Sequence, residues 1–330
     1  MHTTLNTLGL VMNSILIYMI IFKTPKVIRK YSLLILNFAI TDFGSSIFDM
    51  FVEQRIIPGE TSLIYISSGL CSKFGPWTCY VTYTLLLHCY AHSLWSLLLS
   101  FSYRYYILFH PAPKIRTIIL MFIAISPTTI LQTVSFLWAF DPVPQVEARL
   151  HELFPDYDFT NQTVSGTINI FQFSALYTIL HMTVPISPVY VIIFILRRKI
   201  IRKLCDNSES MTKETRQLHS QLLMALTYQS MIPAFYLCAV VSFSIGQLNF
   251  FHHPILEYTV FISFIFIPVF SPLASLYFVG PYREVCRGWW YKVTCRKYDK
   301  KNRIYGSRFS GTMNNNSATG ISQSEAMQAI

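Results

Sequence analysis

Charged residues are scarce in this chain. Asp, Glu, Lys and Arg make up 13% of its 330 residues, whereas a soluble domain carries about 25%. Hydrophobic residues make up 52%, and they form repeated runs of about 20, the length that crosses a hydrocarbon core of roughly 30 Å. This composition excludes a soluble globular protein and indicates a chain that crosses a membrane several times.

Motifs for catalysis and for cofactor binding are also missing. The sequence has no glycine-rich phosphate loop, no His-Glu metalloprotease motif and no glycine-flanked serine suited to nucleophilic attack. The seven cysteines match no metal-ligand spacing, and His88 and His92 share a helix face without an evident third ligand. The last apolar run has no lysine for a retinal Schiff base. We therefore expect no enzyme activity, no cofactor and no metal site.

Seven apolar runs are long enough to be transmembrane helices. Helices are expected because a lone spanning segment must satisfy its own backbone hydrogen bonds in lipid. The predicted fold is therefore all-α, a bundle of seven transmembrane helices within residues 1–278. The predicted spans are 4–22, 31–51, 76–103, 117–140, 170–196, 218–245 and 256–278.

Basic residues are concentrated in alternate connecting segments. The basic set is 23–30, 104–116, 197–217 and 279–330, which together hold 23 of the 26 Lys and Arg residues. Only Arg55, Lys73 and Arg149 lie elsewhere. By the positive-inside rule this asymmetry predicts a cytoplasmic C-terminus and an N-terminus outside. The net charge of +10 is then explained by loops that face anionic lipid, and not by nucleic-acid binding.

Two sites are expected on the outer side. Asn161 begins a glycosylation sequon in the loop 141–169. Cys71 and Cys79 lie near the outer mouth of the third span. The sequence is compatible either with a disulfide between them or with two free thiols.

The region after the last span divides into two parts. Residues 279–301 are basic and rich in Trp, which predicts a helix that lies on the inner leaflet. Cys286 and Cys295 in this segment are candidates for palmitoylation. Residues 302–330 are rich in Gly, Ser, Asn and Thr and are predicted to be a disordered cytoplasmic tail.

A few polar residues and prolines inside the spans need an explanation. Asp42 lies near the middle of the second span, and an ionisable group there indicates function by default. We expect it to be buried among the first, second and seventh helices, bonded to Asn13 or Ser271. Pro233 and Pro272 interrupt later spans, where a missing N–H bends a helix. These positions, together with Arg104, are the predicted switch residues.

A ligand cavity is expected in the outer half of the bundle. Most such cavities are apolar and aromatic with few polar groups. The predicted lining residues are Tyr80, Tyr83, His88, Tyr177, Tyr236 and Phe261. For each of them ordinary helix packing is the alternative.

Several stretches resemble rhodopsin-like G-protein-coupled receptors, with departures. Residues 36–42, LNFAITD, are similar to the second-span motif of those receptors, and Arg104 ends the third span where they place an arginine. Here Tyr103 replaces the usual acidic neighbour of that arginine. Ser271 and Pro272 stand where Asn-Pro is usual, and the outer-loop cysteine that normally bonds to the third span is missing.

These departures fit a divergent family. Residues 1 to about 295 resemble the nematode serpentine chemoreceptors, and among them class delta. The supporting stretches are 54–58, 87–94, 99–106, 218–223 with Gln229 and Pro233, and 278–283.

The resemblance implies a chemosensory receptor in the plasma or ciliary membrane of a sensory neuron. Its implied partners are a small external ligand, a heterotrimeric G protein, and an arrestin and a receptor kinase at the tail. A transporter or channel is the first alternative, although the chain shows no duplicated halves. A non-signalling membrane scaffold is the second, although it would have no use for Arg104.

Overall fold

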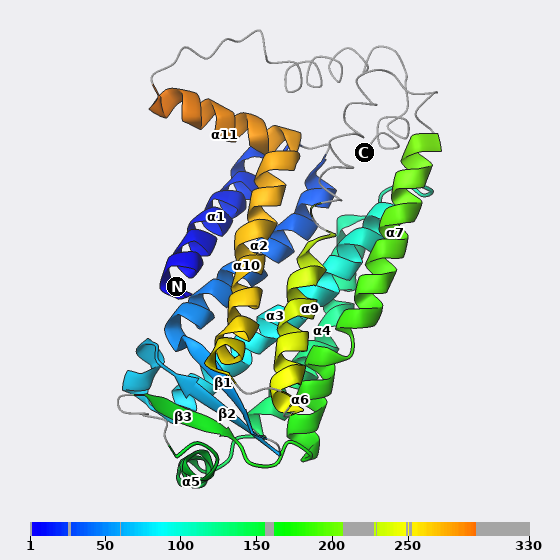
Figure 1. Cartoon of the computed structure of the whole chain (residues 1–330). Helices are drawn as coiled ribbons and strands as arrows, with labels where there is room; N and C mark the ends of the chain where they lie inside the picture. Colours follow the sequence, from blue (N-terminus) through cyan, green and yellow to red (C-terminus); the bar gives the residue numbers. More distant parts are fainter. Residues whose placement is uncertain are drawn as a thin grey trace, which may run out of the picture.

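The structure is a computed structural model that describes residues 2–25, 28–59, 61–155, 162–206, 228, 230–248, 250 and 253–294. Most of this chain is helical (Figure 1). The long helices of the bundle are α1 (His2–Lys23), α2 (Arg29–Val52), α3 (Pro76–Tyr106), α4 (Ile115–Leu137), α6 (Phe173–Thr183), α7 (Ile186–Asp206), α9 (Ile232–Gln247) and α10 (Pro254–Phe278).

Six helical stretches of the described chain are long and apolar enough to cross a bilayer, with α6 and α7 counted as one. The shorter apolar helix α9 occupies the position of the predicted sixth span and has 16 residues. The first half of that predicted span, 218–227, lies outside the described residues. Helices α1 to α4 and α10 begin and end within three residues of their predicted bounds.

The fifth span is interrupted, unlike the single helix predicted for 170–196. Helix α6 ends at Thr183 and α7 starts at Ile186. Pro185 and Pro188 lie at this interruption, and proline has no N–H with which to continue a helical ladder. The helical ladder of the fifth span is therefore interrupted at this point.

A three-stranded antiparallel sheet closes one end of the bundle, and the all-α prediction did not include it. Its strands are β1 (Gln54–Gly59), β2 (Ser62–Ser67) and β3 (Thr163–Thr167), in the order β1-β2-β3. Leu63 and Tyr65 of β2 pack on the bundle core, whereas Ile64 and Ile66 pack on the other side. This alternation follows the period of two of a strand, and both faces of β2 are buried.

Helix α5 (Val143–Leu153) covers the sheet face that points away from the bundle. Its buried residues Val146 and Leu150 form a cluster with Ile57, Ile64 and Val164 of the three strands. The end of the molecule that carries β1, β2, β3 and α5 is called the sheet end below. The sheet end thus has two layers over the helices.

Helix α11 (Gly280–Val293) lies across the opposite end of the bundle, called the α11 end below (Figure 1). Trp289 packs on Tyr18 of α1, with 6.0 Å between ring centroids. The hydroxyls of Tyr282 and Thr24 are 2.9 Å apart. This arrangement agrees with the predicted helix in 279–301, of which residues 295–301 lie outside the described chain.

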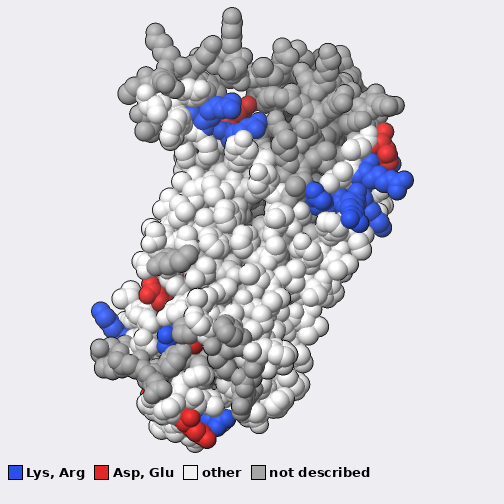
Figure 2. Space-filling model, viewed as in Figure 1, with Lys and Arg blue, Asp and Glu red and all other residues white. Residues whose placement is uncertain are grey.

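Charged side chains gather at the two ends of the bundle. Figure 2 shows Lys and Arg near the α11 end, a mixture of acidic and basic residues at the sheet end, and a broad uncharged band between them. Such a band matches the hydrocarbon layer of a bilayer.

Helix α3 is the axis of the bundle. Eighteen of its 31 residues are buried, whereas five of the 23 residues of α4 are buried. It packs against α2, α4 and α7 and reaches the strand β3 at the sheet end. A helix of this length extends about 46 Å at 1.5 Å per residue, so α3 connects both ends of the molecule.

Candidate functional site

A cavity lies directly beneath the sheet and has a volume of about 70 Å³. Its wall combines strands β1 and β2 with helices α3, α4, α6, α9 and α10, and none of the described residues that line it is charged. The lining residues are Ile56, Leu63, Tyr65, Tyr83, Leu87, Phe136, Thr178, Ile179, Met182, Thr183, Ala239, Val240, Phe243, Val260, Phe261 and Phe264.

Two of the six predicted lining residues line this cavity, namely Tyr83 and Phe261. Their rings meet edge to face, with 5.9 Å between centroids. Tyr83 also lies 4.8 Å from the ring of Tyr65 on β2. The aromatic wall therefore joins α3, α10 and the sheet.

Tyr80 and Tyr236 are buried behind this wall and do not line the cavity. The Tyr80 hydroxyl donates a 2.8 Å hydrogen bond to the carbonyl of Phe136. The Tyr236 hydroxyl donates a 3.0 Å bond to the carbonyl of Tyr90. Both residues pack helices together because a buried tyrosine takes the orientation that satisfies its hydroxyl.

His88 and Tyr177 turn toward α4 and also lie off the cavity lining. The His88 Nδ1 atom is 2.9 Å from the Thr133 hydroxyl. The Tyr177 hydroxyl is 3.5 Å from the carbonyl of Thr128, and its ring stacks on His181 at 5.8 Å. The described chain contains no group of three His, Cys, Asp or Glu that could hold a metal ion.

Loop strands that the sequence did not predict contribute to the cavity. Ile56, Leu63 and Tyr65 form its roof, and they are 5%, 2% and 3% exposed. The available signal was the β-branched and aromatic stretch 62–67, bounded by Gly59 and Gly69. The segment is too short to span a membrane, so the sequence did not predict that it lines the cavity.

Asp42 is buried in the middle of the bundle, between α2, α3 and α10. Its carboxylate accepts a hydrogen bond of 3.5 Å from the Ser93 hydroxyl of α3, and the Ser271 side chain of α10 also interacts with it. One carboxylate oxygen has no partner among the described residues. The expected neighbour Ser271 is therefore present, and Ser93 of α3 is a neighbour that the sequence did not predict.

Asn13 bonds to the backbone of α10 and not to Asp42. Its Nδ2 atom donates to the carbonyl of Pro268 at 2.8 Å. That carbonyl would normally accept from the N–H four residues later, but residue 272 is proline and has no N–H. Asn13 thus supplies the hydrogen bond that Pro272 removes, which ties α1 to the irregular part of α10.

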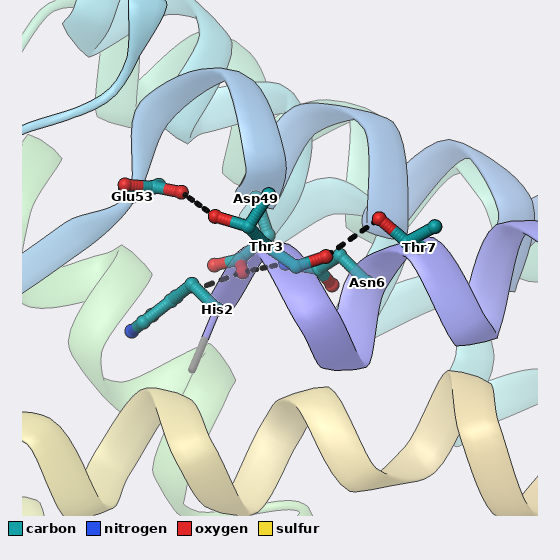
Figure 3. A network of polar contacts seen from close by, with 6 residues as sticks. All are labelled: His2, Thr3, Asn6, Thr7, Asp49 and Glu53. Carbon is teal, nitrogen blue, oxygen red and sulfur yellow. Dashed lines mark hydrogen bonds and ion pairs between the residues drawn. The ribbon is translucent and has the colours of Figure 1, made fainter.

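A second polar network ties the start of α1 to the end of α2 (Figure 3). The buried Asp49 carboxylate accepts from Asn6 and lies 3.0 Å from the His2 ring nitrogen. The Thr3 hydroxyl donates to Glu53 at 2.6 Å. These contacts fix α1 beside the sheet end.

Arg104 lies at the other end of α3 and is buried, with 4% of its side chain exposed. Its guanidinium carbon is 4.8 Å from the ring centroid of Tyr31 on α2. None of its three guanidinium nitrogens has a hydrogen-bond partner in the described part of the chain. A buried guanidinium without hydrogen bonds is costly, and the contact with the Tyr31 ring offsets part of that cost.

Pro233 lies in the first turn of α9, directly after a turn at Ser230 and Met231. The sequence analysis expected it inside a long helix. Proline is well suited to a first turn because the N–H it lacks would be unpaired there. The described break in the sixth span therefore precedes Pro233.

The remaining predicted positions lie near the ends of the bundle. Cys71 and Cys79 are joined by a disulfide next to the start of α3. Cys286 lies on α11, where partial burial raises the pKa of its thiol. Asn161, Cys295 and the tail 302–330 lie outside the described residues.

Comparison with known proteins gives the family. Residues 1–288 match the family described as "Serpentine type 7TM GPCR chemoreceptor Srd". The chain is 40% identical to serpentine receptor class delta-19 of Caenorhabditis elegans and 39% identical to class delta-18. Each of these alignments covers 86% of this chain and 85% of the relative.

The fold is similar to that of squid rhodopsin in its crystal structure. The TM-score is 0.54 and the match covers 91% of this chain and 86% of that chain, at 14% identity. This likeness shows the fold alone and confirms the predicted seven-helix receptor bundle. The chain is thus a multi-pass membrane protein, its family is a receptor family and not an enzyme family, and it belongs to the Srd family of serpentine seven-transmembrane chemoreceptors.

Proposed function

We propose that this chain is a chemosensory receptor that binds a small external ligand in the cavity beneath the sheet and activates a cytosolic G protein. One observation carries the proposal: a single helix bears both the cavity wall and the buried arginine. Tyr83 lines the cavity, and Arg104 lies 21 residues further along α3, or about 32 Å at 1.5 Å per residue. Ligand occupancy at one end can therefore act on the other end through one rigid element.

The orientation proposed for the receptor puts the sheet end outside and the α11 end in the cytoplasm. Arg197, Arg198, Lys199, Arg202 and Lys203 at the end of α7 support it, together with the basic helix α11. Basic segments favour the cytoplasmic face. In this orientation Arg104 lies near the side from which a G protein would bind.

The structure fits a closed state, because Arg104 is buried under neighbouring helices. Opening would bend the sixth span at the break before Pro233, away from α3, and expose Arg104. A ligand shifts such an equilibrium only by binding one state more tightly. A change from 1:99 to 99:1 requires about 5.5 kcal/mol of differential affinity.

Other parts of the proposed role follow from family membership. The location would be the plasma or ciliary membrane of a sensory neuron. Glycosylation at Asn161, palmitoylation at Cys286 or Cys295, and binding of an arrestin and a receptor kinase to 302–330 remain proposals.

The test uses cells that express the receptor with a G-protein activation reporter. A panel of small odorous molecules is first screened on the unaltered chain to find an agonist. Arg104→Ala is then expected to lose activation while surface expression and agonist affinity stay. The control is Arg149→Ala, which removes an ion pair with Glu152 on the exposed face of α5. Normal signalling by Arg104→Ala would contradict the proposal.

A further inference from the structure

The cavity wall offers almost no polar group to a ligand. Thr178 and Thr183 line it, but their hydroxyls already donate to carbonyls of the preceding turn of α6, at 3.2 and 2.7 Å. Tyr65 and Tyr83 supply the other two hydroxyls, and neither has a hydrogen-bond partner among the described residues. Such a wall suits an uncharged, mainly apolar molecule with a group that accepts a hydrogen bond.

The route from the aqueous side is closed. The roof residues of β1 and β2 are nearly fully buried, and α5 packs on the outer face of the same strands. An ion pair of 3.4 Å between Arg55 of β1 and Glu257 of α10 attaches the sheet to the bundle. A ligand that came through this end would have to displace the sheet, α5 and a largely buried ion pair.

Among the described lining residues, those that are partly exposed lie on α6 and α9. Ile179, Met182 and Thr183 of α6 and Val240 and Phe243 of α9 are half-buried, whereas the other lining residues are buried. Helix α6 packs mainly on α4, and α9 packs mainly on α10. The gap between α6 and α9 is therefore the side on which the cavity approaches the surface.

This side of the molecule faces the hydrocarbon layer. The neighbouring outward residues are apolar: Leu180 is 47%, Val184 is 59% and Val241 is 55% exposed. The interruption between α6 and α7 lies beside this gap.

We infer that the ligand is an uncharged apolar molecule with a hydrogen-bond acceptor, and that it enters the cavity from the lipid between α6 and α9. The inference rests on the proposed function, because it takes this cavity as the ligand site. The volume of about 70 Å³ is small beside the 300–1,000 Å³ typical of ligand pockets. A ligand of more than a few heavy atoms requires α6 and α9 to move apart.

The test follows entry directly and needs no signalling. The full chain in lipid nanodiscs is exposed to a photoreactive diazirine analogue of a five-carbon ketone, and labelled residues are mapped by mass spectrometry over time. We expect labelling at the lining residues Tyr83 and Phe261. An excess of the unreactive ketone should reduce this labelling. An analogue that carries a carboxylate should not label them.

Matched variants on adjacent residues of α9 test the route. Val240→Trp blocks the gap and should slow labelling of Tyr83 by about tenfold, since each 1.4 kcal/mol of added barrier slows a step tenfold. Val241→Trp adds the same bulk toward lipid and should leave the rate unchanged. Val240→Ala should speed labelling, which keeps the test valid if the Trp variant does not fold.

The outcomes separate the two proposals. Equal rates for the three Val240 and Val241 variants would overturn the lateral route and leave the receptor function standing. Arg55→Gln removes the ion pair that attaches the sheet to the bundle. If this variant is labelled faster and Val240→Trp has no effect, the ligand enters through the sheet end instead. No competed labelling of any lining residue would overturn both this inference and the cavity as the ligand site.

Discussion

The sheet end and the α11 end of the bundle are stabilised by different kinds of contact. The sheet end has a disulfide between Cys71 and Cys79, a ladder of three strands and the polar network around Asp49 (Figure 3). At the α11 end, Lys30 donates to the carbonyl of Ala112. Arg104 there donates no hydrogen bond within the described chain.

This difference indicates which end moves. Elements that change conformation come from the less stabilised parts of a protein. In the proposed mechanism the sheet end would act as a fixed frame that positions the cavity, and the α11 end would be the part that rearranges on activation. The predictions below test this division.

The largest effect is expected from Phe136→Ala at the sheet end. Phe136 is 2% exposed, stacks on Tyr80 at 4.8 Å and lines the cavity. Removing a buried ring costs about 3–5 kcal/mol, so the free energy of unfolding in detergent should fall by that amount. Phe173→Ala, at a position that is 78% exposed, is the control. Equal losses in the two variants would mean that the aromatic cluster does not stabilise the frame.

The disulfide should contribute less. Cys71→Ser with Cys79→Ser is expected to lower the free energy of unfolding by about 2 kcal/mol, because a closed loop this short removes little entropy from the unfolded chain. Cys238→Ser, at an exposed free cysteine, is the matched control. Thermal unfolding with and without reductant provides the measurement. A loss unaffected by reductant would contradict the covalent link between these residues.

The network around Asp49 is expected to contribute a similar or smaller amount. Asp49→Asn keeps the shape but weakens the bonds from His2 and Asn6, and we expect a loss of about 1–2 kcal/mol. The readout is protease sensitivity of the first helix. Glu53→Gln, which alters an exposed bond to Thr3, should have a smaller effect. A larger loss in Glu53→Gln than in Asp49→Asn would mean that the bond between Thr3 and Glu53 is the stronger link between the two helices.

The smallest effect concerns the end that moves. Tyr31→Leu removes the ring beside Arg104, and a cation–π contact of this kind contributes about 1 kcal/mol. Basal G-protein activation should rise roughly fivefold, since 1.4 kcal/mol corresponds to a factor of ten. Tyr31→Phe keeps the ring and should behave like the unaltered chain. A fall in basal activation would show that the ring stabilises the open state.

The bundle was predictable because its signal is local. Runs of apolar residues give the spans, and the helix bounds differ little from the predictions except at 170–196. The sheet was not predicted because both faces of β2 are buried, so its residues show no alternation of polar and apolar types. Strand β3 is Thr-Val-Ser-Gly-Thr, and its place is set by pairing with a segment about 100 residues earlier.

The cavity residues were only partly predictable for a related reason. An aromatic residue in a span can face the cavity or a neighbouring helix, and the rotation of each helix decides which. Tyr83 faces inward, while Tyr80, three residues earlier, bonds to the carbonyl of Phe136. Likewise, the partner of Asn13 is a carbonyl left open by Pro272, which depends on how α1 packs against α10.

The pairing of β3 with β2 has a consequence for how such receptors diversify. The loop 141–169 is held over the cavity by main-chain hydrogen bonds, and these do not depend on which side chains the loop carries. Gly166 is constrained, because a Cβ atom there would lie 2.4 Å from the carbonyl oxygen of Leu63. Val146, Leu150 and Val164 are constrained as well, because they pack in the cluster between the sheet and α5. In this plan the exposed side chains of α5 can change without altering the bundle beneath.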